Sequence, residues 1–73
     1  MPTNLEALRK ELDITQETLA RAANLPLSTY RRAEKGRPIS FTTAGLIIRA
    51  LNQLRLEHNL EKIEMSALYL NIV

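Results

Sequence analysis

Apolar residues recur at helical spacing along the first three-quarters of the chain. Leu5, Leu8 and Leu12 fall at positions i, i+3 and i+7, which places them on one apolar stripe. The same spacing recurs in Ala44, Ile47, Ile48, Leu51 and Leu54. The pattern predicts four helices, over residues 4–12, 16–23, 26–35 and 41 to about 56.

Helix boundaries are signalled by the residues between these stripes. Thr15 and Ser40 are suited to cap the second and fourth helices, because their hydroxyls can accept a hydrogen bond from a first-turn N–H. Asn24 can take the left-handed conformation that ends a helix, and Gly36 is a similar stop. Pro26 fits the first turn of the third helix, where its missing N–H is not needed.

One residue of the fourth helix is unusual for a helix interior. Gly45 lies inside this most hydrophobic helix at a cost of roughly 1 kcal/mol relative to alanine, which favours a close helix contact at that point.

The C-terminal part of the chain has a less definite pattern. Residues 58–73 allow a short helix near 66–70 or extended structure. Their last part is more apolar than a free tail, so it is expected either to pack on the first or fourth helix or to form a dimer seam. The apolar residues concerned are Tyr69, Leu70, Ile72 and Val73.

The connection between the second and third helices is short enough to dictate their packing. With Asn24 left-handed and the next helix starting within three residues, the two helices must cross steeply. A small residue, Ala20, lets them approach closely. The expected shared interior is Leu19, Ala23, Leu25, Tyr30 and Ala33. The remaining, polar face of the third helix must then point outward.

Charge and composition narrow the possible functions. The formal net charge is +2, but residues 26–37 carry four bases and one acid, whereas residues 57–73 carry three acids and one base. A basic segment on an exposed helix favours a nucleic-acid partner. Cysteine is absent and His58 is the single histidine, so no metal site, catalytic constellation or cofactor is expected. No signal peptide or membrane-spanning run is evident, and a cytoplasmic location is expected.

The segment from Thr15 to Gly36 resembles the helix-turn-helix family of phage repressors and Cro proteins (XRE family). The resembling residues run TQETLA, then NLPLSTYRRAEKG, with LRK before them and IRAL in the following helix. The resemblance covers roughly residues 5–54. It implies an all-α, compact, lambda-repressor-like DNA-binding domain of four to five helices, with the motif at about residues 16–35. The length of the chain suits one domain, expected over residues 1–73, in which residues 58–73 are a C-terminal extension for packing or dimerisation. Asn24 stands where the family usually has glycine, and Pro38 falls about one position earlier than the family's common proline.

Candidate DNA contacts follow from the outer face of the third helix and from the start of the second. Ser28, Thr29 and Arg32 are expected to meet base edges, since arginine can pair bidentately with guanine. Leu27 occupies a family position that is often polar and base-facing, where it would meet either a thymine methyl group or no base at all. The residues expected at phosphates are Gln16, for which the resemblance implies the same role, and Arg31, Lys35 and Arg37.

Several alternatives remain open from the sequence. Arg31 and Arg32 could be solvated, or could pair with Glu34 or Glu17. Tyr30 is expected in the core rather than stacked on a base. The expected function is a sequence-specific regulator, in the role of a repressor, binding double-stranded DNA as the homodimer that the resemblance implies. The alternative is a protein-interaction module or toxin-neutralising partner on the same fold, although a partner-binding face should be more apolar than this one.

Overall fold

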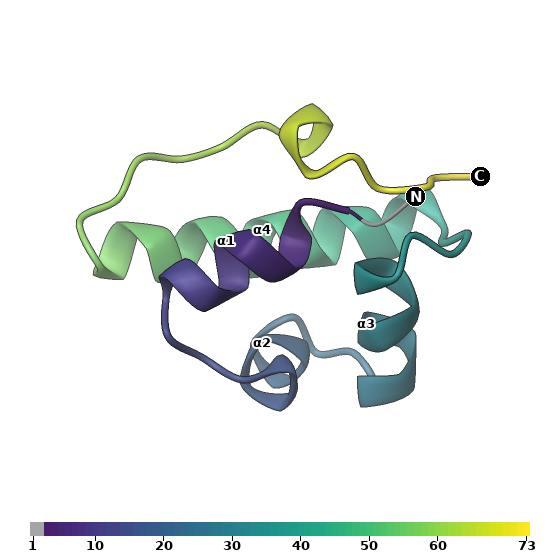
Figure 1. The fold of residues 1–73 in the computed structure, drawn as a ribbon, viewed down its shortest axis with the longest axis horizontal. Helices are drawn as coiled ribbons and strands as arrows, with labels where there is room; N and C mark the ends of the chain where they lie inside the picture. The colour runs from purple at the N-terminus through teal and green to yellow at the C-terminus, as the bar shows by residue number, and fades with distance from the viewer. Residues whose placement is uncertain (1–2) are drawn as a thin grey trace.

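The computed structural model describes residues 3–73, and its architecture over that range is all-helical as expected (Figure 1). The elements are α1 (Leu5–Glu11), α2 (Gln16–Ala22), α3 (Leu27–Glu34), α4 (Phe41–Glu57) and a 3₁₀ turn, η1 (Met65–Leu68). The long helix α4 runs through the middle of the molecule. In the view of Figure 1, α2 and α3 lie on one side of it and the C-terminal segment on the other. The helix α2 packs against both α3 and α4.

One hydrophobic core joins these elements. Its largest fully buried side chains are Leu5, Leu19, Tyr30, Ile47, Leu51 and Leu68, so α1, α2, α3, α4 and η1 each contribute. The expected interior between α2 and α3 is present, with Leu19, Ala20 and Tyr30 buried and Leu25 half-buried. The prediction that Tyr30 is a core residue is therefore confirmed.

Four of the predicted helix signals act at the predicted positions, whereas Pro26 lies just before α3, with ψ 144°, and not in its first turn as expected. The Oγ1 atom of Thr15 accepts a hydrogen bond from the backbone N–H of Thr18 at 3.1 Å, and Ser40 caps α4 in the same way. Asn24 has φ 59° and Gly36 has φ 82°, so both end their helices in the left-handed conformation.

Loss of the Thr15 cap should destabilise the domain modestly. In Thr15→Ala the N–H of Thr18 loses its acceptor, which costs about 1 kcal/mol in the free energy of unfolding. Urea denaturation monitored by circular dichroism measures this loss. Thr42→Ala is the control, because Thr42 is exposed in the first turn of α4 and does not cap it. Equal stability of Thr15→Ala and the unmodified chain would contradict the capping role.

The segment 58–73, which we call the C-terminal strap, returns along α4. The side-chain amide of Asn52 both accepts from the N–H of Ile63 (2.9 Å) and donates to its carbonyl (3.0 Å). Farther along, Leu68 is fully buried and its carbonyl accepts from the N–H of Asn4 at 3.0 Å. The strap therefore contacts both α4 and the start of α1, while Tyr69 and Val73 remain exposed. A dimer seam at these exposed residues stays a prediction.

The last residues of the strap are extended. Ile72 forms an isolated parallel bridge with Ile39, in which the N–H of Ile39 donates to the carbonyl of Asn71 (2.9 Å) and the N–H of Val73 donates to the carbonyl of Ile39 (3.0 Å). Both possibilities left open by the sequence are thus realised in part, since η1 provides the short helix and the bridge provides the extended structure.

The expectation of a close helix contact at Gly45 is wrong. A Cβ atom placed on Gly45 would have no neighbour within 4 Å. The glycine lies beside open space in the first part of α4, and its presence there has no packing explanation.

Candidate nucleic-acid interface

The helix-turn-helix is built from the contact between α2 and α3. The turn between them is closed by a hydrogen bond of 2.9 Å from the N–H of Leu25 to the carbonyl of Ala20. The side chain of Ala20 is buried, and its small size allows the chain to return this closely. Pro26 ends the turn in an extended conformation, and α3 begins at Leu27.

Helix α3 has one buried face and one solvent-facing face. Tyr30 and Ala33 lie in the core, whereas Ser28 and Arg32 are exposed and Thr29 is half-buried. The Nη2 atom of Arg32 makes a long hydrogen bond, 3.4 Å, to the carbonyl of Pro38. Arg32 therefore pairs with neither Glu34 nor Glu17, and its contact with the loop is exposed.

The four residues predicted at phosphates lie around this face without forming one cluster. Arg31, Lys35 and Arg37 are exposed, and Gln16 is half-buried at the first position of α2. Two of them are in contact, since the Nε atom of Arg31 donates to the Oε1 atom of Gln16 at 3.2 Å. Lys35 and Arg37 follow along the end of α3 and the next loop.

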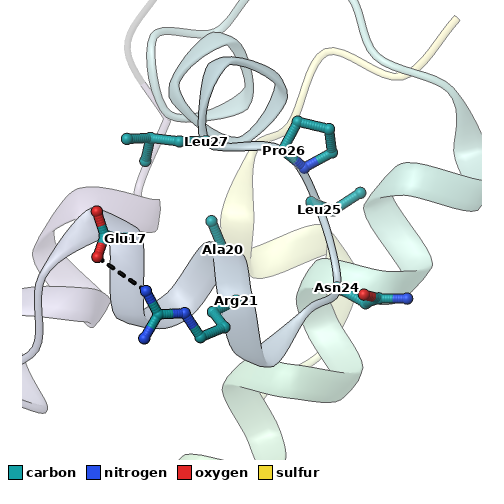
Figure 2. A pocket seen from close by; sticks show the side chains of 7 residues that line it. All are labelled: Glu17, Ala20, Arg21, Asn24, Leu25, Pro26 and Leu27. Atoms are coloured by element: carbon teal, nitrogen blue, oxygen red, sulfur yellow. Dashed lines mark hydrogen bonds and ion pairs between the residues drawn. The ribbon is translucent and has the colours of Figure 1, made fainter.

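A shallow cleft of about 440 Å³ lies where α2 and α3 meet (Figure 2). Pro26 and Leu27 stand on one side of it, and the ion pair between Glu17 Oε1 and Arg21 Nη2 (3.0 Å) on the other. Leu27 is half-buried there, so it presents an apolar surface beside the polar face of α3.

Behind this face, the carboxylate of Glu34 is buried and fully engaged. Its Oε2 atom accepts from the Nε atom of Arg9 at 2.9 Å and from the hydroxyl of Tyr30 at 2.6 Å. Its Oε1 atom accepts from Gln16 Nε2 at 2.8 Å and from Arg9 Nη2 at 3.3 Å. Arg9 also donates to the carbonyl of Ile14 at 2.8 Å. Four residues on α1, α2 and α3 are thus joined through one carboxylate.

These contacts determine the protonation states of Glu34, Arg9 and Tyr30. Burial by itself raises the pKa of Glu34, but hydrogen bonds from Arg9, Tyr30 and Gln16 outweigh burial and lower the pKa below its usual value. The hydrogen bond with Glu34 raises the pKa of Arg9. Burial, followed by the hydrogen bond to Glu34, raises the pKa of Tyr30. At neutral pH, Glu34 and Arg9 are therefore charged and Tyr30 is neutral.

Sequence reasoning missed the part that Arg9 plays. Arg9 lies four residues after Leu5 and three before Leu12, on their buried stripe, although it is a charged residue. Glu34 follows Tyr30 by four residues and so shares its face of α3. A base and an acid on two apolar stripes are the signal that could have predicted a buried pair.

The single histidine of the chain is His58. His58 is exposed, and its Nδ1 atom lies 2.8 Å from the carbonyl of Leu54. Residues 3–73 hold no group of three His, Cys, Asp or Glu side chains that could bind a metal ion. Within the same range, every helix is too short or too polar to cross a membrane.

Comparison with known proteins identifies the family. Residues 5–59 match the family model of helix-turn-helix proteins of the Cro/C1 type, the XRE family. No curated protein and no solved structure gives a match. The family match covers three-quarters of the chain and includes all four α-helices, but ends at the start of the strap. The chain belongs to the Cro/C1-type helix-turn-helix family and is a DNA-binding regulator.

Proposed function

We propose that the protein is a sequence-specific repressor that binds duplex DNA by placing α3 in the major groove. The observation that supports this best is the division of α3 into a buried face and an exposed polar face carrying Ser28 and Arg32. A helix held by its inner face, with free donors on its outer face, fits the width of the major groove.

Base recognition is assigned to four residues. Arg32 exchanges its long contact with the carbonyl of Pro38 for a guanine edge, where a bidentate pair contributes about 1–3 kcal/mol of discrimination. Ser28 and Thr29 can donate to or accept from neighbouring base edges. Leu27, on the apolar side of the cleft, suits the methyl group of a thymine.

We assign the contacts with the phosphate backbone of the DNA to Gln16, Arg31, Lys35 and Arg37. Three of these are cations, and all three are exposed, on α3 or in the few residues after it. Each phosphate neutralised adds about 0.9 to the slope of log K against log salt. Such contacts set the position of α3 in the groove but carry no sequence information.

Repression follows from occupancy of an operator by a homodimer. A single domain of 73 residues offers a small DNA-binding surface, and two copies bound to half-sites about one helical turn apart would double it. The expected location of this activity is the cytoplasm.

The sharpest test separates base contacts from phosphate contacts. Arg32→Ala should lose discrimination at one base pair by about 1–3 kcal/mol, whereas Lys35→Ala should weaken all sequences alike and lower the salt slope by about 0.9. Binding selection from random duplexes at stated salt, followed by affinity measurements on the selected site and single-base variants, measures both. If Arg32→Ala weakened every duplex equally, the base assignment would be wrong.

A further inference from the structure

The hydrogen bonds of the buried Glu34 carboxylate extend to the DNA-facing surface through a single side chain. Gln16 Nε2 donates to Glu34 Oε1 at 2.8 Å, and Gln16 Oε1 accepts from Arg31 Nε at 3.2 Å. Arg31 is exposed on α3, while Glu34 is almost completely buried. A continuous path therefore joins a core carboxylate to a surface guanidinium through an amide on α2.

The chemistry of the two end groups allows one orientation of the Gln16 amide. An ionised carboxylate can only accept hydrogen bonds, and a guanidinium can only donate them. The amide must therefore turn its nitrogen toward Glu34 and its oxygen toward Arg31. The opposite orientation would place an oxygen against a carboxylate and N–H groups against a cation.

This arrangement leaves hydrogen-bond donors without an acceptor on two neighbouring side chains. One hydrogen of Gln16 Nε2 and the Nη1 and Nη2 groups of Arg31 have no hydrogen-bond acceptor within residues 3–73. Because the two side chains are bonded to each other, these free donors lie close together, and they come from different helices of the motif.

We propose that Gln16 and Arg31 bind one phosphate together, as a single clamp, and that Glu34 is the residue that positions it. The proposal rests on the DNA-binding function above and refines it: two contacts assigned separately become one contact with a supporting residue. Arg9 has a further part, since it balances the charge that Glu34 must keep in order to hold Gln16.

A double-mutant cycle tests the clamp. Gln16→Ala and Arg31→Ala should each weaken operator binding by about tenfold, the loss expected for a hydrogen bond to a charged group. The double variant should lose about as much as either single variant, and the salt slope should fall by about 0.9 in all three. Arg31→Ala combined with Lys35→Ala serves as the reference pair, and these two losses should multiply.

A second set of variants tests the positioning residue. Glu34→Gln removes the charge that orients Gln16, so it should weaken binding by about as much as Gln16→Ala and add little in combination with it. Glu11→Gln is the control, since Glu11 Oε1 accepts from Arg55 Nη1 at 2.6 Å in a pair that joins the last residue of α1 to α4. Circular dichroism under the binding conditions establishes the folded fraction of each variant. If Glu34→Gln does not fold, the Gln16–Arg31 cycle decides.

The outcomes separate the clamp from the function on which it rests. Operator binding by the unmodified chain with multiplicative losses in Gln16→Ala and Arg31→Ala would overturn the clamp and leave the DNA-binding proposal standing. Failure of the unmodified chain to select any duplex, with affinity independent of salt, would overturn both.

Discussion

Glu34→Ala should lower the free energy of unfolding by about 3–5 kcal/mol, a large part of the 5–15 kcal/mol typical of a domain. The substitution removes an acceptor that receives hydrogen bonds from Arg9, Tyr30 and Gln16. The guanidinium of Arg9 then stays buried without a counter-charge, and the cost comes from that charge rather than from the lost attraction.

Urea denaturation of three variants isolates this cause. Glu17→Ala is the control, because its pair with Arg21 is exposed and should contribute less than 1 kcal/mol. Arg9→Met combined with Glu34→Leu should recover most of the loss, since it removes both charges and keeps apolar volume. A loss below 1 kcal/mol in Glu34→Ala would mean that the contacts of the Glu34 carboxylate do not hold α1, α2 and α3 together.

The pH dependence of unfolding gives a second measurement of the same contact. The folded state lowers the pKa of Glu34 below the value of about 4.3 expected in the unfolded chain. Its contribution to stability is therefore fully present above that unfolded value and is lost as the pH falls through the lower, folded value. A variant lacking Glu34 should show a flatter decline in stability with acid than the unmodified chain.

Leu68→Ala should cost about 2–5 kcal/mol in the free energy of unfolding, although the residue lies outside the segment matched by the family. Its side chain is fully buried and its backbone carbonyl accepts from Asn4. Truncation leaves a cavity at the junction of the strap with α1 and α4.

Leu56→Ala is the matched control for this loss. Leu56 is 58% exposed on α4, so the same substitution removes far less buried surface. Thermal or urea denaturation of the two variants should therefore give a clear difference in midpoint. Equal midpoints would show that the strap packs too loosely to belong to the domain core.

The four helices could be predicted because their signals are local. Leu5, Leu8 and Leu12 define a stripe without knowledge of what covers it, and Thr15 and Asn24 act on backbone groups within a few residues. The crossing of α2 and α3 also follows from local geometry, since a short turn with a left-handed residue permits few arrangements. The exposed face of α3 could be predicted for the same reason.

The remaining features depend on partners far away in the sequence. Arg9 and Glu34 are separated by 25 positions, and neither reveals its partner until the helices are packed. Ile39 and Ile72 pair through backbone groups, which every residue carries, so their side chains give no sign of the bridge. For the candidate site, the residues of the outer face were predictable, but the link between Gln16 and Arg31 was not, because these residues lie 15 positions apart and meet only when α2 and α3 are packed.

The bridge at Ile39 places the end of the strap near α3, and a separate contact places the first described residue there as well. Near one end, the Oγ1 atom of Thr3 donates to the carbonyl of Glu34 at 3.0 Å; near the other, the Nδ2 atom of Asn71 donates to the carbonyl of Gly36 at 3.4 Å. Thr3 and Asn71 therefore both lie beside the end of α3. If α3 binds DNA as proposed, a fluorophore attached to the chain after Val73 is expected to lie near the end of that helix and to report DNA binding, whereas a bulky fusion at the same place is expected to interfere with it.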